Sequence, residues 1–372
     1  MTFIDTRANA DAFLAAIANV ELLALDTEGA SFHRFIDRIW LIQLATRDKA
    51  AILDPVTSGP MPALAALLAS RDTEVVLHDA SNDLRSIRQD YGWQVTRIFD
   101  TRIAAQLLGV PAFGLAALLA DHFGVKLDKK HQRADWSMRP LSGPMLAYAA
   151  QDTAHLLALR DRLRAELQTA GRLAWAEEEF AALERPLVVD EEERTPAFLR
   201  VKGARDLSPR SLTYFRELVG WREAIARTRD QAPFRVIGNE QLLALACDPP
   251  RTVADLSRIR GASPALFAGK GAELVEMAQG VRALADTALA AFPQHSGARD
   301  LVFEARFAKL KAVRDAAAMK IGLDPGFVCG RVRLEAILTR NPKSLEELAA
   351  IDGVRRWNVE IMGAELVAAL AD

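Results

Sequence analysis

The chain has 372 residues, half of them hydrophobic and 26% charged, with a formal net charge of −2. This composition is ordinary for a soluble protein, and the length predicts two or three domains. The net charge weakly disfavours a nucleic-acid partner, although local basic clusters matter more for such binding. Only Cys247 and Cys329 occur, which excludes a disulfide scaffold and a thiolate zinc site. We expect neither a signal peptide nor a membrane span.

The first 170 residues predict strands that alternate with helices. Short apolar runs predict strands at 20–25, 39–45, 50–53, 75–78 and 97–100. Helical periodicity is found at 61–69, 82–91, 101–108, 115–123 and 144–167. Three early strands followed by alternating helices and strands predict an α/β domain over residues 1–170, with a mixed sheet flanked by helices.

Residues 171–206 carry no strand signal. Glutamate runs at 177–179 and 191–193 make this stretch acidic, and prolines at 186 and 196 interrupt it. Runs of like charge are usually solvated, so we interpret the stretch as an acidic connector between domains.

From residue 207 the sequence is helical and repeats itself at an offset of 92 residues. Glycines and a proline keep the register: Gly238/Gly330, Gly261/Gly353, Gly271/Gly363 and Pro250/Pro342. Chance alignment of helical leucines would not produce these matches. We therefore expect two copies of one small all-α domain, at 207–290 and 291–372.

A pair of carboxylates ends the first predicted strand. Asp26 and Glu28 are two residues apart, so on a strand they point to the same face. They repel each other unless a cation lies between them, and hard divalent ions such as Mg²⁺ favour oxygen ligands. Alternatively, the pair lies at a solvent-exposed strand end and opens a turn.

Two further acidic positions lie at helices. Asp83 follows Ser81 and Asn82 where a strand leads into a helix, and an acid there also suits the helix dipole without any catalytic role. Tyr148 and Asp152 are four apart and share one helix face, so the phenol could orient a water near a metal on Asp152. A half-buried tyrosine beside a solvated aspartate is the alternative.

In order, Asp26-x-Glu28, Asp83 and Tyr148-x-x-x-Asp152 resemble the DEDD exonuclease superfamily. The tyrosine resembles the DEDDy branch, because the other branch has a histidine near that position. Segments 98–101, 126–130 and 133–141 look like the signature of ribonuclease D, and the helical repeats resemble HRDC domains. This resemblance covers roughly residues 15–165 and 207–370.

The resemblance implies a ribonuclease H-like sheet and two-metal hydrolysis of the 3′-terminal phosphodiester, with release of nucleoside 5′-monophosphates. It assigns Asp26, Glu28, Asp83 and Asp152 to two Mg²⁺ or Mn²⁺ ions, and Tyr148 to the attacking water. The expected protein is a cytoplasmic, monomeric 3′→5′ exoribonuclease that trims tRNA precursors and other structured RNAs. A 3′→5′ DNA exonuclease and a catalytically silent RNA-binding scaffold remain alternatives.

Five other residues are candidates for RNA contact. Lys129, Lys130 and Arg133 supply positive charge near Asp152 in sequence, although they could equally form a solvated basic loop. Phe32 and His33 follow Glu28 closely and could stack on the terminal base, although Phe32 could equally belong to a core.

Overall fold

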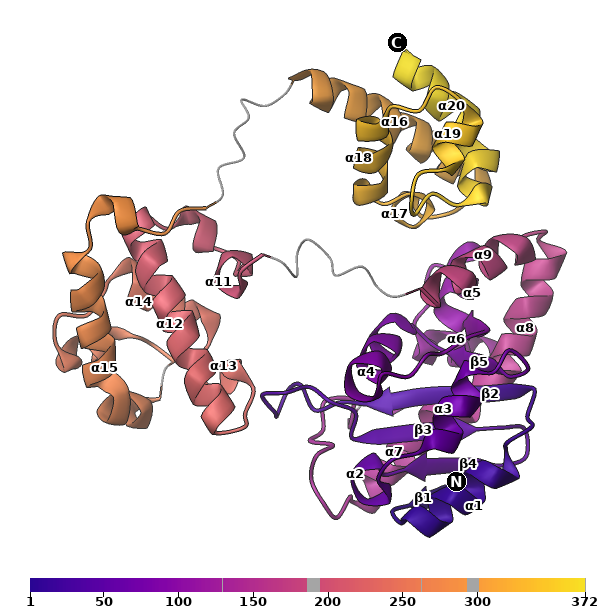
Figure 1. Cartoon of the computed structure of the whole chain (residues 1–372), viewed down its shortest axis with the longest axis horizontal. Helices are drawn as coiled ribbons and strands as arrows, with labels where there is room; N and C mark the ends of the chain where they lie inside the picture. The colour runs from indigo at the N-terminus through magenta and orange to yellow at the C-terminus, as the bar shows by residue number, and fades with distance from the viewer. Residues whose placement is uncertain (129, 186–194, 262, 293–300, 372) are drawn as a thin grey trace.

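The computed structural model describes residues 1–128, 130–185, 195–261, 263–292 and 301–371 (Figure 1). Lys129, predicted to contact RNA, and the glutamate run at 191–193 lie outside the described residues. Among the helices described, none combines the length and apolar character needed to cross a bilayer.

A six-stranded mixed sheet forms the centre of the N-terminal domain. Its order is β1-β4-β3-β2-β5-β6, with β3 antiparallel to both neighbours and the other pairs parallel. The strands are β1 (Thr2–Ile4), β2 (Leu22–Glu28), β3 (Leu41–Ala45), β4 (Ala50–Leu53), β5 (Glu74–Leu77) and β6 (Ile98–Asp100). This arrangement confirms the predicted mixed sheet.

Side-chain alternation along β2 assigns the two faces of the sheet. Leu23 and Leu25 enter a core with helices α1 (Arg7–Ala16), α3 (Pro62–Ala69) and α4 (Ser81–Tyr91), near the short α2 (Pro55–Ser58). Ala24 enters the opposite core. The helices on that side are α5 (Thr101–Leu107), α6 (Leu115–Phe123), α7 (Gly143–Ala154), α8 (Leu156–Thr169) and α9 (Leu173–Leu183). Asp26 and Glu28 lie two and four residues after Ala24 and therefore share its face of the strand, so they point towards α7 and α8.

The first part of the expected solvated connector is instead the packed helix α9. Ala176 and Phe180 lie four residues apart and are buried, and the Phe180 ring lies 4.7 Å from that of Phe99 on β6. The glutamates at 177–179 lie between these two apolar positions, so the sequence shows the charge run that is typical of a solvated stretch. After the undescribed residues, the chain continues through α11 (Ala197–Arg200) and the 3₁₀ turn η1 (Ala204–Asp206).

Two helical domains follow, as the repeat predicts. The first contains α12 (Pro209–Thr228), α13 (Pro233–Val236), α14 (Asn239–Cys247), η2 (Val253–Arg258) and α15 (Pro264–Ala283), then η3 (Asp286–Ala288). The second contains α16 (Leu301–Ile321), α17 (Pro325–Val328), α18 (Arg331–Arg340), α19 (Leu345–Ala349) and α20 (Arg356–Ala371). Each long helix has its counterpart in the other copy, in the same order.

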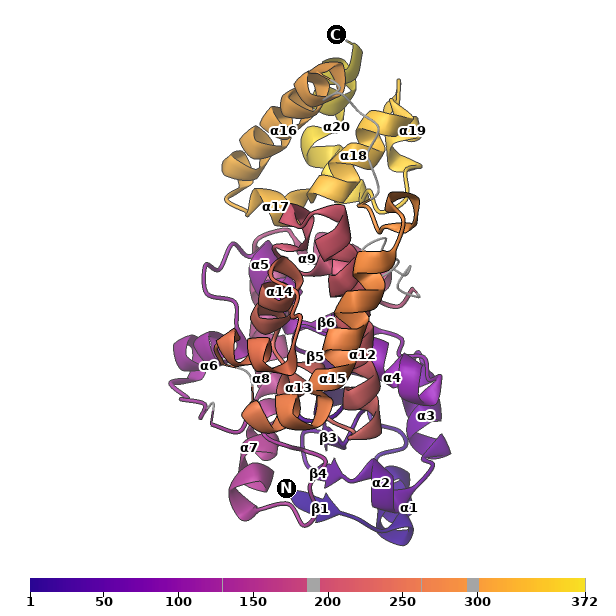
Figure 2. The ribbon, with the colours of Figure 1, turned by 90° about the vertical axis from the view of Figure 1, so that its left-hand side faces the viewer.

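Both helical domains contact the nuclease-like domain (Figures 1 and 2). The first lies against the loop at 30–37, where Arg235 donates to the Phe32 carbonyl. The second lies beside α9, and its core is continuous with the core beneath α5, α8 and α9. The C-terminal half of the chain therefore contacts the sheet domain at two places, the loop at 30–37 and helix α9.

Candidate active site

Three carboxylates meet at the end of β2. Asp26 and Glu28 come from this strand, and Asp152 comes from the third turn of α7, which packs across the sheet. One carboxylate oxygen of each lies within 4.8 Å of the others. Oxygen ligands at this spacing suit a hard divalent cation such as Mg²⁺ or Mn²⁺. The donor set present therefore fits the metal chemistry that the sequence predicts.

Asp83 approaches this cluster from the opposite face of the sheet. It lies in the first turn of α4, and it accepts a hydrogen bond from the hydroxyl of Thr27. Because Thr27 lies between Asp26 and Glu28, this hydrogen bond places Asp83 close to both, and its negative charge contributes to raising their pKa values. The structure thus brings all four predicted carboxylates into one region, although Asp83 is not part of the 4.8 Å group.

The electrostatics of the cluster favour a cation. Burial and then repulsion from neighbouring carboxylates raise the pKa values of Asp26 and Glu28 well above the ordinary range. Burial likewise raises the pKa of Asp152 to about 7 and that of Asp83 to about 6. Four like charges cannot all ionise together here without a compensating positive charge.

Tyr148 lies on α7 one turn before Asp152. Its ring lies 5.9 Å from that of the buried Trp136 and 6.2 Å from that of His131, which together fix its direction. Burial, followed by repulsion from Asp152 and Glu28, raises the pKa of the Tyr148 phenol. The hydroxyl is therefore neutral at physiological pH and is available as a hydrogen-bond donor.

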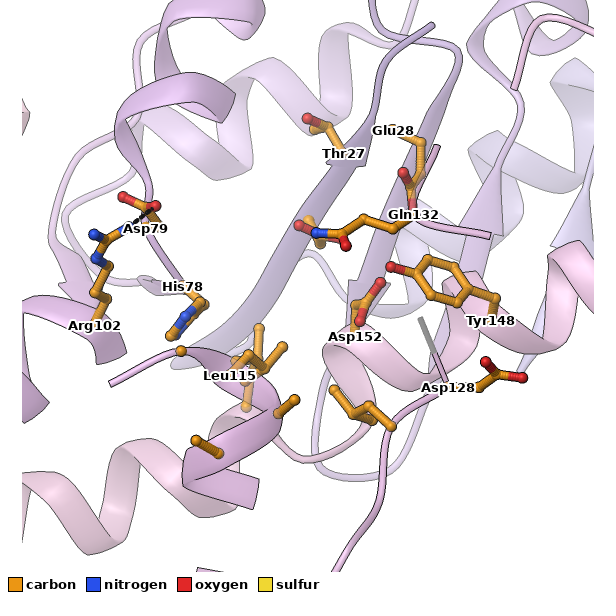
Figure 3. A pocket seen from close by; sticks show the side chains of 16 residues that line it. Thr27, Glu28, His78, Asp79, Arg102, Leu115, Asp128, Gln132, Tyr148 and Asp152 are labelled. Atoms are coloured by element: carbon orange, nitrogen blue, oxygen red, sulfur yellow. Dashed lines mark hydrogen bonds and ion pairs between the residues drawn. The ribbon is translucent and has the colours of Figure 1, made fainter. Parts of the chain in front are cut away.

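A pocket of about 480 Å³ opens over these groups (Figure 3). Beyond the predicted residues, it is lined by polar groups that sequence reasoning missed: Thr27, His78, Asp79, Arg102, Asp128 and Gln132. Buried Gln43, opposite Asp26 in the β2–β3 register, also donates to Glu28 at 3.4 Å. Strand pairing places Gln43 here, and the fold brings residues 78, 79, 102, 128 and 132 to the pocket from separate segments, so spacing along the chain carried no signal for them.

Three of the five predicted RNA-contact residues, Phe32, His33 and Arg133, lie at the junction with the first helical domain. Phe32 packs edge-to-face on Phe234, and the Arg133 guanidinium lies 4.9 Å from the Phe32 ring centre. His33 contacts Arg235 and the Arg133 carbonyl, each at 2.9 Å. Phe32 and His33 therefore connect two domains and the loop that carries Arg133.

Lys130 lies apart from this junction. Its side chain is 82% exposed, and its ammonium lies 3.8 Å from Asp128, a residue that lines the pocket. Neither Lys130 nor the junction residues Phe32, His33 and Arg133 line the pocket itself. Their contact with RNA stays a prediction.

Comparison with known proteins agrees with this geometry. A family described as 3′-5′ exonuclease matches residues 1–168, and the HRDC domain matches residues 211–277 and 303–370. The chain is 33% identical over 270 residues to ribonuclease D of Gluconacetobacter diazotrophicus, covering 72% of this chain and 68% of that protein. It is also 33% identical to ribonuclease D of Cronobacter turicensis, covering 72% of both.

The whole fold also matches a solved structure. The crystal structure of Escherichia coli RNase D superposes with a TM-score of 0.72 over 99% of this chain and 98% of that one, at 24% identity. The fold and its acidic site define a 3′→5′ exonuclease with a ribonuclease H-like sheet and two HRDC domains. Within that class the chain belongs to the ribonuclease D family, and it is a hydrolytic 3′→5′ exoribonuclease.

Proposed function

We propose that this exoribonuclease trims the 3′ ends of tRNA precursors and other structured RNAs with two Mg²⁺ or Mn²⁺ ions. The observation that carries the metal assignment is the meeting of Asp26, Glu28 and Asp152 within 4.8 Å, with Asp83 beside them. Four carboxylates match the charge of two divalent ions. Bound in this way, the ions would supply an activated water and neutralise charge on the reacting phosphate.

The chain's own side chains then perform distinct tasks. The carboxylates of β2, α4 and α7 would hold the two ions. Tyr148 keeps its proton and uses its hydroxyl to position the attacking water, because a neutral phenol donates without acting as a base. Gln43 orients Glu28 through its amide. The products are a nucleoside 5′-monophosphate and an RNA that is one residue shorter.

The proposal also covers the domain organisation, the oligomeric state and the location of the enzyme. It comprises an exonuclease domain at 1–170 that is extended by the packed helix α9, a connector after α9 up to residue 206, and HRDC domains at 207–290 and 291–372, acting as a monomer in the cytoplasm. The two helical domains contact the exonuclease domain on two sides, which supports one compact chain as the working unit.

Release of a 3′ label from a tRNA precursor tests this function. The wild type should release label with Mg²⁺ and not with EDTA. Asp26→Asn and Asp152→Asn should each abolish release, because each removes one metal-binding charge, while binding of the RNA persists. Release by both variants at the wild-type rate would contradict the assignment of the metal site.

A matched DNA separates the two alternatives. Label released from DNA and not from RNA would indicate a DNA exonuclease, because the carboxylates do not themselves read the 2′-hydroxyl. Binding without release from either substrate would indicate a silent RNA-binding scaffold.

A further inference from the structure

Two charged side chains, Asp79 and Arg102, lie on the wall of the active-site pocket that faces Tyr148 and Asp152 (Figure 3). Asp79 follows the end of β5, and Arg102 lies in the first turn of α5, just after β6. Arg102 donates a hydrogen bond to the Asp79 carboxylate. Both side chains remain accessible, with 37% of Arg102 and 46% of Asp79 exposed.

The backbone beneath this pair is fixed by the buried carboxylate of Asp100. Its oxygens accept the N–H groups of Asp79 at 3.2 Å, Ala80 at 2.8 Å and Arg102 at 2.7 Å. The Arg102 guanidinium also lies 5.1 Å from the ring centre of Phe113. An accessible cation is therefore held in one place before any ligand arrives, which lowers the entropy cost of binding.

The charge of the pocket makes this cation unusual. Among the lining residues that the structure describes, Arg102 is the one with a permanent positive charge. His78 contributes none at neutral pH, because burial lowers its pKa to about 4. The lining acids are Asp26, Glu28, Asp79, Asp128 and Asp152. An RNA strand that enters such a pocket needs a positive group for any phosphate that is not at the metal-binding carboxylates.

The chemistry of an RNA 3′ end identifies that phosphate. The terminal nucleotide carries one phosphate, the scissile one, and hydrolysis requires that phosphate at the carboxylate cluster. A guanidinium on the facing wall can therefore meet only a phosphate further along the strand. Arginine also suits phosphate oxygens because its fork of N–H donors can bind two of them together.

We propose that Arg102 binds the phosphate immediately 5′ of the scissile phosphate, and that Asp79 holds the guanidinium in position for it. The proposal rests on the proposed function, and it assigns to Arg102 a positioning role in the known reaction. Asp79 keeps the cation from turning towards the metal-binding carboxylates while the pocket is empty of RNA. On binding, the phosphate joins or replaces Asp79 as the partner of Arg102.

A set of short RNAs with one neutral linkage tests the contact directly. A methylphosphonate replaces one phosphodiester at a time, and kcat/KM is measured for release of the 3′-terminal nucleotide. For the wild type, neutralising the linkage next to the scissile one should lower kcat/KM about tenfold, as expected for one charge-assisted contact. For Arg102→Gln the same replacement should cost less than about twofold, because the contact is already lost. Arg102→Lys should retain part of the sensitivity.

Salt dependence and a control variant complete the test. Arg102→Gln should also reduce the slope of log kcat/KM against log salt by about one. Arg47, 54% exposed and paired with Asp161 at 2.7 Å outside the pocket, provides the control, and Arg47→Gln should keep the full wild-type sensitivity. If Arg102→Gln remained as sensitive as the wild type at that linkage, the proposal would be wrong. Failure of the wild type to release any nucleotide from unmodified RNA would instead contradict the proposed function.

Discussion

At the scale of single residues, the protonation of the site decides its chemistry. The carboxylate cluster and the neutral phenol of Tyr148 are both withdrawn from solvent, and burial raises the pKa values of both kinds of group. A carboxylate whose pKa is raised gives up its proton when a metal binds. A tyrosine whose pKa is raised keeps its proton, and so acts as a donor.

Tyr148→Phe should lower kcat by roughly 10²-fold with little change in KM, because the lost hydroxyl positions water only during reaction. Steady-state rates on a short 3′-labelled RNA measure this. Tyr91→Phe is the matched control, since Tyr91 stacks on Trp93 away from the pocket. A KM effect alone would show that Tyr148 binds substrate instead.

Metal affinity should depend on pH with a defined sign. With a pKa of about 7, Asp152 is mostly protonated at pH 6, so the metal must displace a proton there. Binding measured by calorimetry should be about tenfold weaker at pH 6 than at pH 8, with protons released at pH 6. Equal affinity at both pH values would contradict the raised pKa.

The free energy of unfolding of the metal-free protein should decrease as pH rises, whereas metal affinity should increase. The folded-state pKa values of Asp83 and Asp152, about 6 and 7, lie above the unfolded value near 3.9. Their contribution to stability is thus full below pH 4 and is lost as pH rises through 6 and 7. Urea unfolding at pH 5 and pH 8 should show a smaller pH effect in Asp152→Asn than in the wild type. Saturating Mg²⁺ at pH 8 should restore stability.

At the scale of elements, the repeat is explained by close contacts at equivalent glycines. A Cβ on Gly271 would lie 2.9 Å from atoms of Val253 and Leu256. A Cβ on Gly363 would lie 3.1 Å from Leu345 and 3.4 Å from Leu348, the residues 92 positions further on. The equivalent helix approaches the equivalent preceding turn closely in both domains, so glycine avoids crowding at both positions.

Gly271→Ala should therefore lower the free energy of unfolding by about 1–3 kcal/mol through overpacking. Gly280→Ala on the same helix is the matched control, because a Cβ there meets nothing within 4 Å. It should instead stabilise the protein by about 0.5–1 kcal/mol through helix propensity. Denaturant unfolding measures both, and equal effects of the two variants would contradict the close approach.

The sequence predicted the elements whose signals are local. The strands that carry Asp26 and precede Asp83 were foreseen from apolar runs, as were both helical domains from their register. Strand β1 was missed, because it has only three residues and is defined by pairing with distant β4. The helix expected at 144–167 is divided at His155, because α7 packs over β3 and β4 while α8 packs with α5. No proline or glycine marks that division.

The predicted site shows the same limit. Spacing indicated that Asp26 and Glu28, and likewise Tyr148 and Asp152, share one face of a strand or a helix, and the family resemblance then joined them with Asp83 into one predicted site. The partners Thr27, Gln43 and Arg102 could not be foreseen in this way. Their roles depend on which strands and helices become neighbours in the fold.

At the scale of the whole molecule, the second helical domain is part of the same folded unit as the exonuclease domain. Trp357 is 1% exposed, its ring stacks 5.2 Å from Trp175 on α9, and its indole N–H donates to Glu179 at 2.9 Å. Arg355 also pairs with Glu179, at 3.1 Å, and both side chains are largely buried. The two domains should therefore unfold together.

Trp175→Ala should separate them. We expect faster amide hydrogen exchange in α20 and the appearance of a second thermal transition, because the variant removes the stacking contact that links α9 to Trp357. Glu177→Ala, on the same helix but 56% exposed and near Arg164, should change neither observation. One transition in Trp175→Ala, with unchanged exchange, would show that the shared core does not couple the domains.

Mass spectrometry of the product formed in ¹⁸O-labelled water tests the central claim most directly, namely that the acidic cluster directs water onto the 3′-terminal phosphodiester. With Mg²⁺, the wild type should release nucleoside 5′-monophosphate with one ¹⁸O in its phosphate and should leave an unlabelled 3′-hydroxyl on the RNA. Asp26→Asn and Asp152→Asn should form no product. Nucleoside 3′-monophosphate, product without ¹⁸O, or equal product from these variants would contradict the account.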